Sequence, residues 1–80
     1  MTTSQHKYNI YFIIAKNIKK YRKQNKLTQQ ELAKKSGYSY AYIRRIEGPK
    51  CSKNFSVLTL YNISLALNID IKYLFDKDDI

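Results

Sequence analysis

The segment TQQELAKKSGYSYAYIRRIEG, residues 28–48, restricts the possible folds of this chain more than any other feature. It begins with a capping-box pattern, in which the Thr28 hydroxyl accepts a hydrogen bond from the Glu31 amide and Glu31 reaches back. The helical pattern that follows ends at Gly37, because glycine takes the left-handed conformation of a helix C-cap at low cost. Ser39 is suited to cap another helix directly afterwards. The segment therefore predicts two short helices joined by a tight turn.

The spacing of small and apolar residues predicts how these two helices pack. Two helices that cross at about 90–120° through a turn of three or four residues form a helix-turn-helix. Ala33 is the small residue expected where the helices come closest, and Gly37 takes the turn. The residues expected to face inward are Leu32, Tyr38, Ile43 and Ile46. Six positions with this spacing are a much stronger signal than any one of them alone.

Length and composition set the size and class of the fold. Eighty residues allow one small domain, and a hydrophobic content of 44% is enough for a packed core. Two glycines and one proline are too few for an all-β chain with many turns. Further helical patterns cover about residues 9–26, a segment capped by Ser56, and about residues 71–75. The segment capped by Ser56 is the fourth helix in the chain, and its Leu60, Ile63 and Leu67 are expected to face inward.

We therefore expect a compact, all-α, five-helix domain over residues 9–75. A flexible arm, residues 1–8, should precede it, and a short acidic tail, residues 76–80, should follow.

The charge of this chain is unevenly distributed. The net charge is +9, with thirteen basic residues against Glu31 and Glu47 up to Lys53, and a balance of −2 from Asn54 onward. A cationic surface on one part of a molecule indicates a polyanionic partner, either nucleic acid or an anionic membrane. General solubility is the alternative explanation for such a charge.

The segment LTQQELAKKSGYSYAYIRRIEG resembles the Cro and phage-repressor type of helix-turn-helix, the xenobiotic-response-element class of bacterial regulators. The resemblance extends over about residues 12–75 and implies a five-helix, lambda-repressor-like domain that binds DNA and often forms homodimers. Two features differ from the family's usual pattern. Tyr38 replaces a small aliphatic residue, and the loop GPKCSKNFS is longer than the usual connection.

The exposed residues of the predicted recognition helix, about residues 40–47, are the candidates for reading bases. Arg45 is the strongest, because a guanidinium can bridge O6 and N7 of guanine in the major groove. By motif position, Tyr40, Ala41 and Arg45 match the base-contacting sites of the family, and Arg44 can serve a base or the backbone. The alternative is that both arginines are only solvated surface charges.

The expected contacts to the DNA backbone lie around this helix. The family uses the glutamine at position 29 for this purpose, at a helix N-terminus that attracts anions. The full set expected at the backbone is Gln29, Ser39, Lys50, Ser52 and Lys53. The resemblance also implies an ion pair between Arg22 and Glu47 that fixes the recognition helix on its scaffold. An ordinary surface pair is the alternative.

Other functions have little support in the sequence. His6 and Cys51 lack neighbouring ligands for zinc, and no catalytic triad, paired-carboxylate cleft or phosphate-binding glycine loop is recognisable. We therefore expect no enzyme activity, cofactor, metal or small-molecule ligand. Base stacking on the eight tyrosines is a minor alternative, since several fall among apolar residues at helical spacing. Cys51 is either a thiol sensor or an ordinary exposed cysteine.

The localisation follows from cysteine content and hydropathy. A single cysteine is consistent with a reducing cytoplasm, and the apolar run at residues 10–14 is too short for a leader or a membrane span. We expect a cytoplasmic protein that associates with the nucleoid and does not bind membranes.

The predicted function is sequence-specific binding of double-stranded DNA by a transcriptional regulator, as a homodimer with half-sites about 34 Å apart. Residues expected at the dimer interface are Tyr61, Leu65, Ile69, Tyr73 and Ile80, in the fourth and fifth helices, with residues 10–12 as a second possibility. A phage-type repressor, a restriction–modification controller and an antitoxin all remain possible. A rival prediction is a protein-interaction module that does not read DNA sequence.

Overall fold

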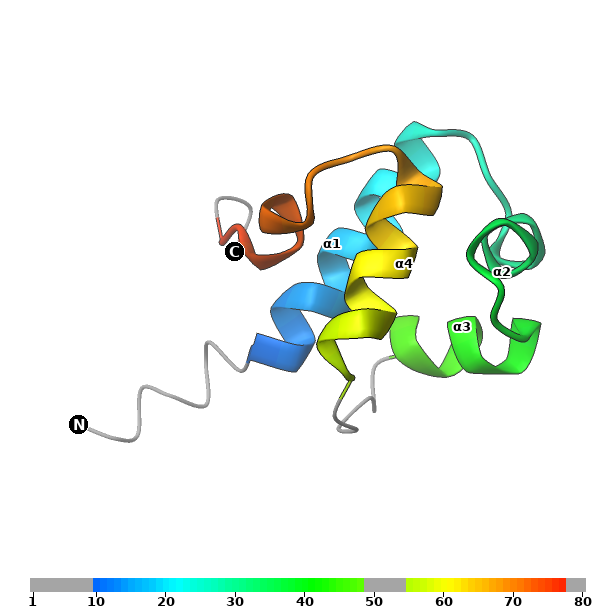
Figure 1. Cartoon of the computed structure of the whole chain (residues 1–80), viewed down its shortest axis with the longest axis horizontal. Helices are drawn as coiled ribbons and strands as arrows, with labels where there is room; N and C mark the ends of the chain where they lie inside the picture. Colours follow the sequence, from blue (N-terminus) through cyan, green and yellow to red (C-terminus); the bar gives the residue numbers. More distant parts are fainter. Residues whose placement is uncertain (1–9, 49–54, 78–80) are drawn as a thin grey trace.

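The computed structural model describes residues 10–48 and 55–77, and within these ranges it is helical and contains no strand. Its elements, in chain order, are α1 (Ile10–Gln24), α2 (Gln29–Ser36), α3 (Tyr40–Glu47), α4 (Val57–Leu67) and the 3-10 helix η2 (Ile71–Phe75). α1 and α4 lie next to each other in the middle of the molecule, with α2 and α3 on one side of them and η2 on the other (Figure 1). The all-helical prediction is confirmed.

The helix boundaries in the segment 28–48 follow its sequence signals. Thr28 accepts from the Glu31 amide at 3.0 Å, and the Glu31 carboxylate accepts from the Thr28 amide at 2.8 Å, so the capping box is complete. Gly37 ends α2 with a φ of 84°, in the left-handed region. Ser39 then caps α3 by accepting from the Tyr42 amide. These local interactions set where the two short helices begin and where α2 ends.

The fifth element differs from the prediction, because it is a 3-10 helix instead of an α-helix. The Asp70 side chain accepts from the Lys72 amide, and the Tyr73 amide donates to the Asp70 carbonyl, three residues earlier. This i+3 bonding tightens the segment into a 3-10 turn, which is stable only over a few residues. The described part of the chain therefore has four α-helices and one 3-10 helix.

The core lies between α1, α2, α3 and α4, and η2 closes it. Ile18, Leu32, Ile43, Ile63 and Leu74 are completely or almost completely buried within it. The expected inward residues Leu32, Ile43 and Ile46, and Leu60, Ile63 and Leu67, are all buried. Tyr38 is different, because it is only half-buried and packs against the edge of the core.

Asn17 links α1 to the end of η2 by hydrogen bonds. Its side chain is 3% exposed, and its Nδ2 donates to the Leu74 carbonyl at 2.9 Å and to the Asp76 carbonyl at 2.8 Å. These bonds satisfy both amide hydrogens of a buried polar group, which would otherwise be costly to bury. They also satisfy carbonyls at the end of η2. The sequence pattern did not reveal this role, because Asn17 sits among charged and apolar residues without a motif of its own.

Several sequence predictions lie outside the described residues. They concern the arm at residues 1–8, Lys50, Ser52, Lys53 and Cys51 in the loop after α3, and the acidic tail beyond Lys77.

Candidate nucleic-acid interface

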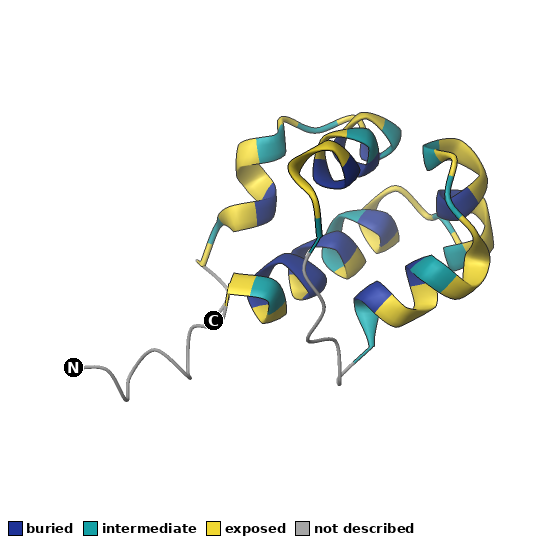
Figure 2. Cartoon of the chain, turned by 60° about the horizontal axis from the view of Figure 1, so that its bottom comes forward, coloured by how far each residue is buried: buried dark blue, intermediate teal, exposed yellow. Residues whose placement is uncertain are grey.

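α3 presents one buried and one exposed side. Ile43 and Ile46 are 0% and 2% exposed and fix the helix on the core. The predicted contact residues Ser39, Tyr40, Ala41, Arg44 and Arg45 are all exposed. Figure 2 shows the same division along the helix, with buried residues on its inner side and exposed residues outside. The sequence-predicted base-contacting residues therefore share one solvent-facing surface, which we call the α3 outer face.

Both arginines of the α3 outer face lie over tyrosine rings. The Arg44 guanidinium carbon is 5.5 Å from the centre of the Tyr40 ring, and that of Arg45 is 5.7 Å from the Tyr42 ring. These distances are within the range of cation–π attraction. Stacking limits the number of conformations that each arginine samples while leaving it exposed.

Tyr42 is a residue that the sequence analysis did not single out. Its ring is half-buried and lies 5.2 Å, centre to centre, from the ring of Tyr38. Tyr38 is in turn bonded to α4, because its hydroxyl accepts from Asn62 Nδ2 at 3.1 Å and lies 3.4 Å from Thr59 Oγ1. The two tyrosines thus link α4 to the underside of Arg45. The alternation of tyrosines with other residues in YSYAY was the available signal.

The base of α3 is held by a buried ion pair. Arg22 donates from Nε to Glu47 Oε2 at 2.8 Å and from Nη2 to Glu47 Oε1 at 3.0 Å. The two side chains are 9% and 2% exposed, so this is not an ordinary surface pair. Arg22 Nη1 also donates to the Leu27 carbonyl at 2.7 Å. The guanidinium therefore joins α1, the α1–α2 turn and the end of α3 at one point.

Gln29 completes this cluster. Its Nε2 donates to Glu47 Oε1 at 3.0 Å, and the residue is half-buried. The side chain thereby fixes the start of α2 to the end of α3. The structure therefore gives Gln29 an intramolecular partner that the sequence analysis did not foresee, in addition to the backbone contact it predicts.

The electrostatic asymmetry of the sequence persists in the described ranges. Residues 10–48 carry ten basic and two acidic side chains, a net charge of +8. Residues 55–77 carry Lys72 and Lys77 against Asp70 and Asp76, and α4 itself has no charged residue. The segment of α1, α2 and α3, which includes the α3 outer face, is therefore the cationic part of the described molecule.

α4 exposes an apolar stripe to solvent. Its members are the neighbours Val57 and Leu58, then Tyr61 and Leu65, which follow at intervals of about one turn; 75%, 65%, 49% and 58% of these residues are exposed. Two of the predicted interface residues, Tyr61 and Leu65, belong to this stripe. Tyr73 on η2 is 43% exposed, Ile69 is half-buried, and Ile80 lies outside the described residues. Of the alternative surface at residues 10–12, Ile10 and Phe12 are exposed.

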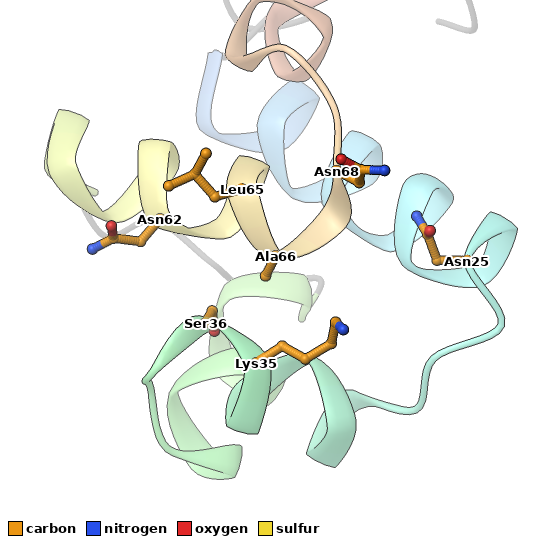
Figure 3. Close-up of a pocket in the computed structure, with 7 residues that line it drawn as sticks. All are labelled: Asn25, Lys35, Ser36, Asn62, Leu65, Ala66 and Asn68. Atoms are coloured by element: carbon orange, nitrogen blue, oxygen red, sulfur yellow. The ribbon is translucent and has the colours of Figure 1, made fainter.

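An open polar hollow lies beside the contact between α2 and α4, near the end of α1. Its volume is about 560 Å³, and Figure 3 shows the residues around it, which lie just after α1, at the end of α2, and along and just after α4. Several of its polar groups are already bonded within the protein. Asn25 Nδ2 donates to two carbonyls, Ser36 Oγ donates to the Leu32 carbonyl, and Asn62 Nδ2 donates to Tyr38. None of the residues that line the hollow belongs to α3, so the hollow is separate from the α3 outer face.

Residues 10–48 and 55–77 contain neither a metal-binding cluster nor a membrane-spanning helix. No three His, Cys, Asp or Glu side chains in this part of the chain are grouped to hold a metal ion. None of its helices has the length and hydropathy needed to cross a bilayer.

Comparison with known proteins gives concordant matches. The family model described as helix-turn-helix matches residues 18–74. The control protein C.SmaI of Serratia marcescens is 34% identical over 65 residues, which are 81% of this chain and 75% of that protein.

Two solved structures are similar to this fold. The restriction-modification controller protein C.AhdI from Aeromonas hydrophila matches with a TM-score of 0.74 and 25% identity, over 81% of this chain and 96% of that chain. The N-terminal DNA binding domain of SinR from Bacillus subtilis matches with a TM-score of 0.76 and 30% identity, over 86% of this chain and 99% of that one.

Proposed function

This chain belongs to the helix-turn-helix family, and from that premise we propose that it is a DNA-binding transcriptional regulator of a bacterium or its mobile element. The observation that carries the proposal is the α3 outer face. It is exposed, it lies on the cationic part of the molecule, and its helix is fixed from below by Ile43, Ile46 and Glu47. A rigid, outward-facing helix of this kind is what a major groove admits.

The proposed division of roles follows exposure and chemistry. Arg45 and Arg44 read base edges with their guanidinium groups, Ala41 contacts a thymine methyl, and Tyr40 contacts a methyl or a phosphate. Gln29 and Ser39, together with Lys50, Ser52 and Lys53 of the following loop, contact the DNA backbone. The Arg22–Glu47 pair has no direct part in binding and sets the position of α3.

We place the subunit contact of a homodimer on α4. A single recognition helix covers only a few base pairs, so useful specificity needs a second copy on a two-fold operator. The apolar stripe of α4 lacks charged residues, and an exposed row of large apolar side chains is typical of an interaction surface.

Control of restriction–modification genes is the role best supported within this class. The 34% identical relative is a control protein, and one of the two similar structures is a restriction-modification controller. Such a regulator acts in the cytoplasm, where bacterial DNA lies. No catalytic step is part of this proposal.

Selection of bound sequences from a pool of random DNA duplexes tests the proposal directly. The wild-type chain should enrich a sequence with two-fold symmetry. Arg45→Ala should lose the preference at one base pair of each half-site, by a factor of about 5 to 150, because a bidentate arginine–guanine contact contributes about 1–3 kcal/mol of discrimination.

The dependence of affinity on salt separates this function from its rival. A regulator that reads DNA still binds its preferred duplex more tightly than an unrelated duplex as salt rises, although both affinities fall. A protein-interaction module with a basic surface would bind both duplexes with equal affinity, and both affinities would fall together as salt rises. That second result, with no enriched sequence, contradicts the proposed function.

A further inference from the structure

Arg45 differs from Arg44 in what supports it. Arg44 lies over Tyr40, a residue that is 43% exposed and is itself a candidate for DNA contact. Arg45 lies over Tyr42, whose ring is half-buried and packs against Tyr38. The ring beneath Arg44 therefore lies at the surface, whereas the ring beneath Arg45 is packed against a second tyrosine ring.

The support beneath Arg45 extends to another helix. The Tyr38 hydroxyl accepts from Asn62 Nδ2 at 3.1 Å and lies near Thr59 Oγ1, which is 2.9 Å from Ser56 Oγ. Ser56 is the cap of α4, Thr59 lies in its first turn and Asn62 in its middle. The position of the Tyr38 ring, and with it that of Tyr42, is therefore set by α4 and not only by the turn between α2 and α3.

The geometry of an arginine stacked on a ring leaves its hydrogen-bonding groups available. A guanidinium interacts with an aromatic ring through its flat face, whereas its N–H groups donate in the plane of the group. A contact of that kind with the Tyr42 ring, whose centre is 5.7 Å from the Arg45 guanidinium carbon, leaves the N–H groups available for a bidentate contact to guanine. It removes side-chain conformations that would otherwise have to be lost on binding, and such preorganisation raises affinity for the correct partner.

Resting on the proposed function, we propose that Tyr42, braced by Tyr38 and Asn62, is a specificity-determining positioning residue that holds Arg45 ready to read a guanine. Tyr42 acts through Arg45 and through the face of its ring. Its hydroxyl is not needed for this role. The identity of residue 42 thereby controls how sharply one base pair is read, although Tyr42 itself is only partly accessible.

Four variants separate this role from a direct contact and from a folding defect. Tyr42→Leu keeps apolar bulk but removes the ring, and Tyr42→Phe keeps the ring but removes the hydroxyl. Tyr40→Leu is the matched control, because it removes the equivalent ring beneath the other arginine. Arg45→Ala identifies the base pair that Arg45 reads. The thermal unfolding midpoint of each variant verifies that it is folded at the temperature of the binding measurement.

The main measurement is the ratio of affinities for the selected duplex and for a duplex changed only at the Arg45 base pair. We expect Tyr42→Leu to lower this ratio about two- to fivefold, the factor that corresponds to an exposed cation–π contact. Tyr42→Phe should keep the wild-type ratio. Tyr40→Leu should alter preference at a different base pair.

A second measurement needs no DNA. Protons above an aromatic ring resonate upfield, so the δ protons of Arg45 should be shifted upfield in the NMR spectrum of the wild-type chain and of Tyr42→Phe. Tyr42→Leu should abolish this shift. If the shift is absent in the wild-type chain, the stacking and the inference are both wrong.

The outcomes distinguish this inference from the function on which it rests. If the wild-type chain enriches no sequence, the proposed function fails and takes the inference with it. If Arg45→Ala loses its base preference while Tyr42→Leu retains the full ratio, the proposed function stands and only the inference is overturned. If Tyr42→Phe loses as much as Tyr42→Leu, the hydroxyl makes the contact, which also overturns it.

Discussion

At Glu47, side chains from α1 and α2 meet the last residue of α3. Its carboxylate accepts two hydrogen bonds from Arg22 and one from Gln29, while its side chain is only 2% exposed. The net contribution of such a buried pair is small, since desolvation opposes the attraction. Removing one partner is much more costly, because a charge then remains buried without its counter-ion.

We therefore predict that Arg22→Met lowers the free energy of unfolding by about 3–5 kcal/mol. The double variant Arg22→Met with Glu47→Leu should lose clearly less unfolding free energy than the two single variants lose in sum. Urea unfolding at constant pH measures all three. Lys23→Met, at the exposed neighbouring position, is the control and should change stability by about 0.5 kcal/mol or less. Additive single and double effects would show that the pair does not act as a unit.

Gly37 has a purely conformational role. Its φ is 84°, and a Cβ built there would meet no atom within 4 Å. The cost of a side chain at this position is therefore backbone strain without a clash.

We predict that Gly37→Ala lowers the free energy of unfolding by about 1–2 kcal/mol, the cost of a left-handed conformation for an L-residue. Gly37→Asn should cost less, because asparagine tolerates this region better. Thermal or urea unfolding measures both changes. Equal losses for alanine and asparagine would point to a steric cause and contradict the argument.

At the scale of the elements, local signals determined what the sequence could predict. Thr28, Gly37, Ser39 and Ser56 are residues whose side chains or backbone preferences act within four positions of themselves. The starts and ends of α2 and α3, and the start of α4, were therefore predictable. So was the buried side of each helix, because apolar spacing directly reflects it.

The features that could not be predicted from the sequence depend on residues that are far apart in the chain. Asn17 bonds to carbonyls 57 and 59 residues away, and Tyr38 bonds to Asn62 across 24 residues. No local pattern marks such partners. The same reason explains why the sequence did not foresee the partner of Gln29, or the supporting position of Tyr42. The form of η2 was missed because five residues have too few positions to distinguish an α-helix from a 3-10 helix.

The cap of α3 allows stability and DNA contact to be separated at one residue. Ser39 Oγ accepts from the Tyr42 amide at 3.0 Å. Ser39→Ala removes this bond and should lower the free energy of unfolding by about 1 kcal/mol. Ser39→Asp preserves a capping oxygen and should keep stability, but its negative charge should weaken binding if a phosphate lies beside it as proposed. Unfolding and duplex-binding measurements on both variants test this.

Gln24→Glu is the charge control for that prediction. It adds one negative charge at an exposed position of α1, outside the residues proposed to contact DNA. DNA affinity should therefore fall less than in Ser39→Asp. Equal losses for the two variants would reflect net charge alone and remove Ser39 from the set of backbone contacts.

At the scale of the whole molecule, the charged helices and the uncharged α4 suggest separate surfaces for DNA and for a second copy. If α4 forms the dimer contact, a charge within its apolar stripe must be buried without a partner. We predict that Leu65→Glu raises the dimer dissociation constant at least tenfold, as measured by analytical ultracentrifugation. Affinity for the two-fold operator should fall with it, because each copy then binds alone.

Gln24→Glu supplies the comparison, since it adds the same charge at an exposed position of α1. Its self-association should remain close to that of the wild-type chain. If Leu65→Glu stays as dimeric as Gln24→Glu, the contact lies elsewhere, and exposed Ile10 and Phe12 become the next residues to change.

The link from Asn17 to the carbonyls of Leu74 and Asp76 also bears on when the domain can form during synthesis. On the ribosome, α1 emerges first, yet the acceptors that Asn17 needs are made more than fifty residues later. Until then a growing chain must leave this amide in water or bury it unsatisfied. The complete domain, and with it a settled recognition surface, is therefore reached only after translation has passed Asp76.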